Sequence, residues 1–177
     1  MNNSTLDIIK IILDKQMNMP AGRVFAYNGS QDLPKDRNLF IVLSIAEQSP
    51  YANNIRYKST NEGLVEIQTQ NIAEDIIISC CSVNTEARDR VKEVNWALKS
   101  YFAQYQQEKY KLHISQINPV RDKSFLEETT MLNRFDVEIR VIRGYEKQTL
   151  IDYYDNYSVD LWTKGEGEVV KDSFYFP

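Results

Sequence analysis

The sequence predicts an α+β domain, because two stretches place apolar residues at helical spacing and a third alternates with the period of a β-strand. In the alternating stretch, Phe135, Val137, Ile139 and Val141 share one face, and charged residues occupy the other. This pattern needs one buried and one polar face, which is typical of an antiparallel sheet. The length of 177 residues suits one such domain with an appended segment.

Two helices are expected, and both have recognisable start signals. The first should cover residues 4–17, because Ser4 and Asp7 have the spacing of a capping box, in which each side chain pairs with a free amide at the helix start. The second is expected as one continuous amphipathic helix of about six turns that starts at residue 84 or 85 and ends near Lys109. Its apolar stripe consists of Ala87, Val91, Val94, Leu98, Tyr101 or Phe102, and Tyr105.

The β segments are short in this interpretation, and turn signals separate them. Residues 18–38 are expected to form a long loop. Ser49-Pro50 should end a strand, and Asn61-Glu62-Gly63 and Gly144 should each begin a turn. Strands are therefore expected over residues 39–46, 55–59, 64–69, 76–81, 112–117, 134–141 and 149–154.

The C-terminal part of the chain differs from the rest in charge and pattern. Residues 144–177 contain seven acids and three bases, whereas the remaining 18 acids and 18 bases balance each other, so this segment carries the whole net charge of −4. Regular apolar spacing stops after residue 154. We therefore divide the chain into a domain over residues 1–154 and an arm over residues 155–177. The arm either orders against a neighbouring subunit or folds back over its own sheet, and its aromatic residues Trp162, Phe174, Tyr175 and Phe176 are candidate contact residues.

No signature of enzymatic chemistry is found. The sequence lacks a phosphate-binding loop, a dinucleotide-binding glycine motif and a nucleophile elbow. Cys80 and Cys81 are neighbours on an expected strand and point to opposite faces, so they are expected to be free buried thiols. With His113 as the single histidine, a zinc site of ordinary spacing cannot be built. We expect no catalytic residue, no cofactor and no metal, and therefore not an enzyme.

The sequence also indicates where the protein resides. No signal peptide opens the chain, and the apolar run at residues 6–13 is too short to cross a bilayer. We expect a protein that is made in a cytoplasm and does not bind membranes. The acidic net charge argues against a dedicated nucleic-acid binder.

The charged face of the alternating strand has two interpretations. Arg134, Asp136, Glu138 and Arg140 alternate in sign along it. They are either a solvated face that prevents edge aggregation or a subunit contact in which alternating charges fix the register between neighbours.

The order of elements, together with the RFDVEIRV wording of residues 134–141 and the later Ile151-Asp152-Tyr153-Tyr154, resembles the tail terminator (neck terminator) proteins of tailed bacteriophages. The resemblance covers residues 4–154. It implies a mixed, mainly antiparallel sheet with two helices packed on it. It also implies a virion protein of the neck, assembled in the host cytoplasm as a hexameric ring that ends the tail tube.

The resemblance further implies the partners. These are other copies of the chain, the tail tube protein and the head–tail connector or stopper protein, with phage DNA passing through the ring without sequence-specific binding. Two alternatives remain open at this point. The chain is another neck or tail component, such as a head-completion (stopper) protein, or a small ferredoxin-like domain that binds a ligand over its sheet.

Overall fold

We describe the fold from a computed structural model, in which residues 4–27, 34, 36–60, 63–127 and 130–151 are described. The chain divides into two compact units. One consists of Met1–Asn54 and Thr69–Glu146, and the other of Ile55–Gln68 and Lys147–Pro177. The expected arm at residues 155–177 and the turn at residues 61–62 lie outside the described residues.

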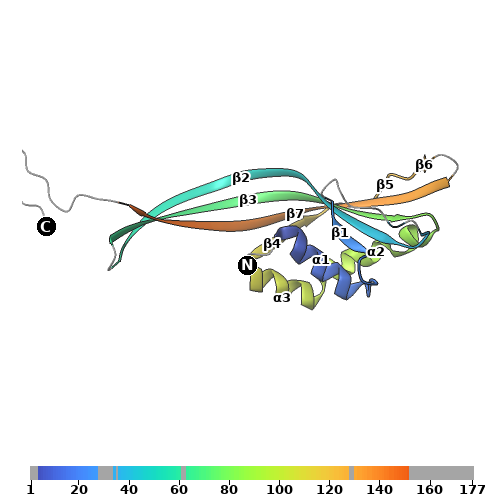
Figure 1. Cartoon of the computed structure of the whole chain (residues 1–177), viewed down its shortest axis with the longest axis horizontal. Helices are drawn as coiled ribbons and strands as arrows, with labels where there is room; N and C mark the ends of the chain where they lie inside the picture. The colour runs from blue at the N-terminus through green and yellow to red at the C-terminus, as the bar shows by residue number, and fades with distance from the viewer. Residues whose placement is uncertain (1–3, 28–33, 35, 61–62, 128–129, 152–177) are drawn as a thin grey trace, which may run out of the picture. The chain divides into compact units, whose positions relative to one another are not determined.

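The described residues form an α+β fold with a mixed, mainly antiparallel sheet, as the sequence predicts (Figure 1). The sheet order is β1-β2-β3-β7-β4, and β5 and β6 also pair with β7. The β1–β2 pair is parallel, whereas β4, β5 and β6 all run antiparallel to β7. The strands are β1 (Val24–Ala26), β2 (Phe40–Thr60), β3 (Gly63–Ser82), β4 (Leu112–Ile117), β5 (Arg121–Asp122), β6 (Phe125–Glu127) and β7 (Thr130–Ile151).

Helix α1 (Thr5–Gln16) begins with the expected capping box. The Asp7 amide donates to the Ser4 hydroxyl oxygen at 3.2 Å, and the Ser4 amide donates to the Asp7 carboxylate at 3.1 Å. Two of the amides that a helix start leaves unpaired are thereby satisfied. The helix buries one face, consisting of Thr5, Ile8, Ile9, Ile12 and Leu13.

The expected single long helix is in fact two helices, which corrects the prediction. Helix α2 (Glu86–Lys99) ends at Ser100, whose extended backbone (φ −66°, ψ 157°) begins helix α3 (Tyr101–Tyr110). The Ser100 hydroxyl accepts a hydrogen bond from the Ala103 amide at 3.1 Å, so a serine cap restarts the helix at this point.

The break changes which face of the second helix is buried. Tyr101 and Tyr105 are exposed and do not continue the apolar stripe, whereas Ala103 and Gln106 are buried. Phe102, the alternative to Tyr101 in the predicted stripe, is partly buried and packs against the main core. The first part of the stripe is confirmed, since Ala87, Val91, Val94 and Leu98 are buried.

Three strands are much longer than predicted. Strand β2 continues through Ser49-Pro50, and β7 continues through Gly144. Strand β3 joins the two strands expected over residues 64–69 and 76–81, so none of these three breaks exists. Proline is tolerated in β2 because β1 covers only residues 41–43 and leaves the rest of that edge without a partner among the described residues. At Gly144 a Cβ atom would lie 3.1 Å from the Asn71 side-chain oxygen on β3, so glycine leaves room for this side chain here.

Long-range pairing also creates strands where loops were expected. Strand β1 lies within the expected loop of residues 18–38 and pairs in parallel with Ile41–Leu43 of β2. Strands β5 and β6 lie in the segment before residue 128 and pair with β7. The β1 and β5 pairs depend on partners further along the chain, which local pattern does not reveal, whereas β6 pairs with the directly following start of β7.

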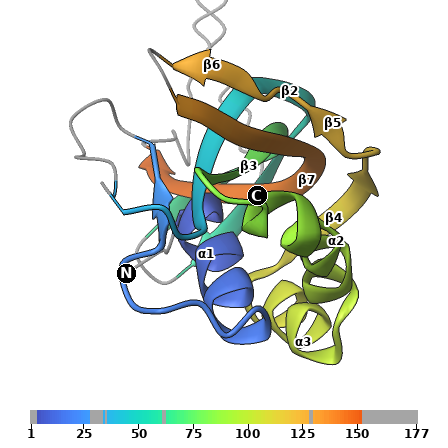
Figure 2. The same ribbon diagram turned by 90° about the vertical axis from the view of Figure 1, so that its right-hand side faces the viewer.

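The helices cover one face of the sheet (Figures 1 and 2). The main core combines α1 and α2 with the apolar rows of β2, β3 and β7, and it includes Val94, Leu98, Val137 and Ile139. A smaller cluster of Phe25, Phe40 and Cys81 is separate from this core, with the two phenylalanine rings stacked at 6.1 Å between centroids. No helix among the described residues is long and apolar enough to span a membrane.

Candidate assembly surfaces

The predicted charged row, Arg134, Asp136, Glu138 and Arg140, lies along β7, and each member has a hydrogen-bond or ion-pair partner in the chain. The Arg134 guanidinium donates to Asp136 on the same strand at 2.9 Å and to the Ser79 hydroxyl on β3 at 3.2 Å. Arg140 donates two hydrogen bonds to the Asp75 carboxylate on β3, at 2.7 and 2.6 Å. These bonds hold β7 in register against β3.

The middle of the row is paired more loosely. The Glu138 carboxylate lies 3.9 Å from the guanidinium of Arg121, which is on the neighbouring strand β5. Arg121 is largely exposed, and such surface ion pairs contribute little to stability. All four residues of the row therefore have partners inside the chain, and a contact with another subunit would add to or replace these pairs.

A cavity of about 440 Å³ lies next to the smaller apolar cluster. Its wall is mainly apolar, and the Arg134 side chain lines it beside two serines. Phe125 and Leu132, from β6 and the start of β7, complete it. The full lining is Tyr27, Phe40, Val42, Ser44, Ser79, Cys81, Phe125, Leu132 and Arg134.

The two cysteines are free and buried, as predicted. Burial raises the pKa of the Cys81 thiol to about 11, and it raises the pKa of Cys80 still further. Because the thiolate is the reactive form, both thiols are unreactive near neutral pH. No group of three or more potential metal-binding side chains is found in the part of the chain that the structure describes.

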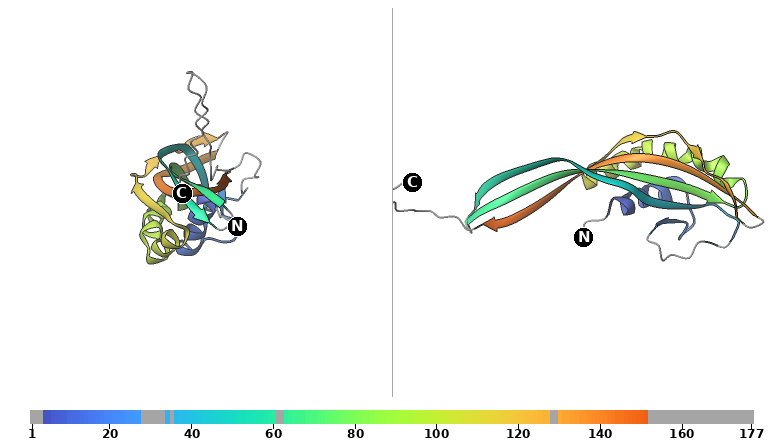
Figure 3. Two further views of the ribbon diagram at one scale, coloured as in Figure 1. Left: turned by 90° about the vertical axis from the view of Figure 1, so that its left-hand side faces the viewer. Right: turned by 90° about the horizontal axis from the view of Figure 1, so that it is seen from above.

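The outer edge of β2 is the most exposed β structure described. Every residue from Ile45 to Thr60 is exposed, including the large side chains of Tyr51, Ile55 and Tyr57. Beyond Leu43 this strand has β3 on one side and no described strand on the other. Figure 3 shows β2, β3 and β7 running side by side. An edge of this kind can pair with a strand of another chain.

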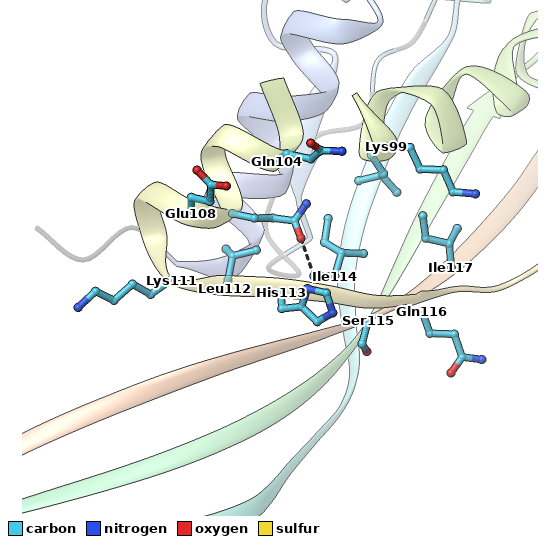
Figure 4. A pocket seen from close by; sticks show the side chains of 12 residues that line it. Lys99, Gln104, Glu108, Lys111, Leu112, His113, Ile114, Ser115, Gln116 and Ile117 are labelled. Atoms are coloured by element: carbon cyan, nitrogen blue, oxygen red, sulfur yellow. Dashed lines mark hydrogen bonds between the residues drawn. The ribbon is translucent and has the colours of Figure 1, made fainter. Parts of the chain in front are cut away.

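An open groove of about 1000 Å³ lies between helix α3 and strand β4 (Figure 4). Strand β4 is the last strand of the sheet, so one of its edges has no strand partner among the described residues. The Ile114 amide on this strand donates to the Gln107 side-chain oxygen of α3 at 2.9 Å, shown dashed in Figure 4. His113 is exposed on the same strand, as one of the residues that line the groove.

The remaining predicted contact residues, Trp162, Phe174, Tyr175 and Phe176, lie outside the described residues. Sequence reasoning missed the partners Asp75 and Ser79, because each bonds to a strand more than fifty residues away. It also missed the groove residue Gln107, which bonds to an amide seven residues away on the next element. The exposed part of β2 could have been predicted as strand, because Tyr51, Ile55 and Tyr57 all lie at odd-numbered, same-face positions. Pro50 instead led us to end the strand at Ser49-Pro50.

Comparison of the sequence with known protein families and with curated proteins finds no match.

Proposed function

We propose that the chain is a structural subunit of the neck of a tailed phage particle, forming a ring that ends the tail tube and joins it to the head connector. The exposed edge of β2 is the observation that carries this proposal. Among the described residues, β2 has no strand neighbour along this edge from Ser44 to Thr60. Soluble proteins usually shorten, charge or cover such an edge, since it otherwise pairs with other chains. This part of β2 carries Pro50, Arg56 and Lys58, but it also exposes large side chains at Tyr51, Ile55 and Tyr57.

In a ring, the exposed edge of β2 could form a contact with the next subunit. Closed rings are built from heterologous contacts, in which two different patches of each subunit meet. The exposed edge of β2 provides one patch with large side chains, and β4 has a second edge without a strand neighbour among the described residues. Resemblance of residues 4–154 to the tail terminators supports the same assignment, with six copies in the ring.

The partners and location follow from this proposal. The ring contacts the tail tube protein on one side and the connector or stopper protein on the other, in the virion neck. Phage DNA passes through without being read by sequence, which fits the net charge of −4.

The mass of the purified protein in solution, measured by light scattering and combined with negative-stain images, tests the proposal. We expect closed rings in solution or on isolated tails. A protein that stays monomeric at high concentration and is also absent from purified tails contradicts it. A head-completion protein, the closest structural alternative, would be found on heads and not on isolated tails.

The 440 Å³ cavity favours a second candidate function, that of a small ligand-binding domain. Its volume lies in the range of small-molecule sites, and Arg134 supplies one cation beside apolar walls. A monomer whose melting temperature rises with an apolar anionic compound, and in which Arg134→Gln abolishes this rise, would support this candidate over the ring.

A further inference from the structure

At the edge of β4 that has no strand neighbour among the described residues, a side chain accepts a backbone hydrogen bond that an added strand could accept instead. Backbone amides that are not exposed need a partner, and the Ile114 amide has one in the Gln107 side-chain oxygen. An incoming strand would offer a backbone carbonyl oxygen to the same amide. Gln107 can give way to it, because the side chain comes from helix α3 and not from a paired strand.

The groove beside this edge has the surface that an extended peptide requires. Leu98, Ile114 and Ile117 contribute apolar side chains to its lining. Lys99 and Lys111 supply two positive charges against one acid, Glu108, and all three are exposed (Figure 4). Strand addition obtains affinity from backbone hydrogen bonds and specificity from alternate side chains, and both are available here.

The chain contains a segment of complementary pattern outside the described residues. Within residues 157–163 a short alternation remains, with Ser158 and Asp160 between Tyr157, Val159 and Leu161, and Trp162 follows it. In an extended strand the three apolar residues would share one face, and Ser158, Asp160 and Trp162 the other. The segment belongs to the acidic part of the chain, residues 144–177, with its seven acids and three bases.

We infer that residues 157–163 of one copy add a strand to the free edge of β4 in a second copy, in the groove beside α3. Val159 and Leu161 face the apolar lining, and the net negative charge of residues 144–177 favours docking beside Lys99 and Lys111. This inference rests on the proposed ring and names one of its subunit contacts. The groove and the acidic segment are different patches of one chain, as a heterologous contact requires.

Mixing two variants of the full chain, each with one added cysteine, tests the contact. Gln116→Cys places a thiol on exposed β4 beside the groove, and Ser158→Cys places one in the docking segment. The native thiols are buried and do not compete. With the two variants tagged differently in size, we expect a mixed disulfide dimer on mild oxidation. Lys123→Cys, which is exposed and outside the groove lining, replaces Gln116→Cys in the control. It should give at least about tenfold less mixed disulfide dimer with Ser158→Cys.

Backbone pairing is tested by two further variants. Asp160→Pro removes a backbone donor from the segment and should weaken cross-linking roughly fivefold or more, because each lost hydrogen bond costs about that factor in affinity. Gln107→Ala removes the competing side chain and should leave cross-linking equal or raise it. Gln104→Ala, exposed on the same helix, is the control. If Gln107 is purely structural, Gln107→Ala lowers the melting temperature and cross-linking together.

Charge is tested separately, in a variant that does not alter the backbone. Lys111→Glu should reduce the mixed dimer, because it replaces one of the two groove lysines with an acid that repels the acidic segment. An undiminished mixed dimer in this variant overturns the charge complementarity between the segment and the groove.

The outcomes separate this contact from the proposed function. Rings that form without the mixed disulfide and tolerate Asp160→Pro overturn the inference and leave the ring intact. A disulfide found only within single chains, in the Gln116→Cys/Ser158→Cys double variant, also overturns it. A mixed disulfide without closed rings, and with no protein on purified tails, supports the contact and overturns the proposed function.

Discussion

Arg140 on β7 donates two hydrogen bonds to the carboxylate of Asp75 on β3, with nitrogen–oxygen distances of 2.7 and 2.6 Å. The two residues are far apart in the sequence, and a bidentate pair of this kind fixes one register between the strands. The hydrogen bonds from Arg140 lower the pKa of Asp75 below its usual value, in spite of an opposing contribution from burial.

This pair predicts a pH-dependent loss of stability. Because the folded-state pKa of Asp75 is lowered, its contribution to stability is present above the unfolded-state pKa of about 4 and is lost as pH falls through the folded value. Asp75→Asn should therefore lower the melting temperature at pH 7, and its curve should approach that of the unmodified protein below about pH 3. Glu108→Gln, an exposed substitution on α3, is the control. A difference in melting temperature that persists undiminished in acid would show that lost packing causes it.

The core packing of α2 predicts a large effect at one position. Leu98 is buried in the main cluster together with Val137 and Ile139. Leu98→Ala should reduce the free energy of unfolding by about 2–5 kcal/mol, since the cavity adds to the lost transfer energy. Lys92→Ala on the exposed face of the same helix should change it by less than about 0.5 kcal/mol. Urea denaturation measures both, and an unchanged midpoint for Leu98→Ala contradicts the assigned packing.

The restart of the helix at Ser100 predicts a difference between two cap positions. Ser100→Ala removes the hydrogen bond to the Ala103 amide and should cost about 1 kcal/mol. Thr85 stands at the cap of α2 but makes no side-chain cap bond, so Thr85→Ala should cost much less. Equal effects in urea denaturation would indicate that the Ser100 hydroxyl does not stabilise α3.

The exposed edge of β2 predicts that assembly and stability can be separated. Ile55→Lys replaces an exposed apolar side chain with a charge, a change that natural edges use against pairing. We expect smaller assemblies by light scattering and an almost unchanged melting temperature. Asn54→Lys is the control for added charge, as its neighbour on the same exposed strand. If both variants assemble like the unmodified protein, this part of β2 is not a subunit contact.

The buried thiols predict resistance to labelling. Since burial raises the pKa of Cys81 to about 11, little thiolate exists at pH 8, and Cys80 is buried more deeply. A thiol reagent should label neither cysteine in the native protein within minutes, and it should label both in denaturant. Rapid labelling of one thiol in the native state would reveal local opening at the end of β3.

Local signals predicted part of this structure well. The capping box of Ser4 and Asp7 and the alternating row of Phe135, Val137, Ile139 and Val141 each arise within one element, and the structure confirms them. Ser100 is less decisive in sequence, because serine is neutral inside a helix and favourable at its cap.

The candidate surfaces depend on partners that no single segment contains. Pro50 is compatible with β2 only because one edge of that strand is free, a property of the whole sheet order. The charged row of β7 was identified from its alternation, but its partners Asp75 and Ser79 lie more than fifty residues earlier. The groove beside β4 depends in the same way on α3 meeting an edge strand.

The position of β7 in the sheet has a consequence for how the chain folds. This strand pairs with β3 on one side and with β4, β5 and β6 along its length. It is also the last of the described strands to be synthesised. Until it emerges from the ribosome, the edges of β3, β4, β5 and β6 that pair with it have no partner. We therefore expect slow folding limited by closure of these distant pairs, and a nascent chain that needs protection from aggregation until β7 is complete.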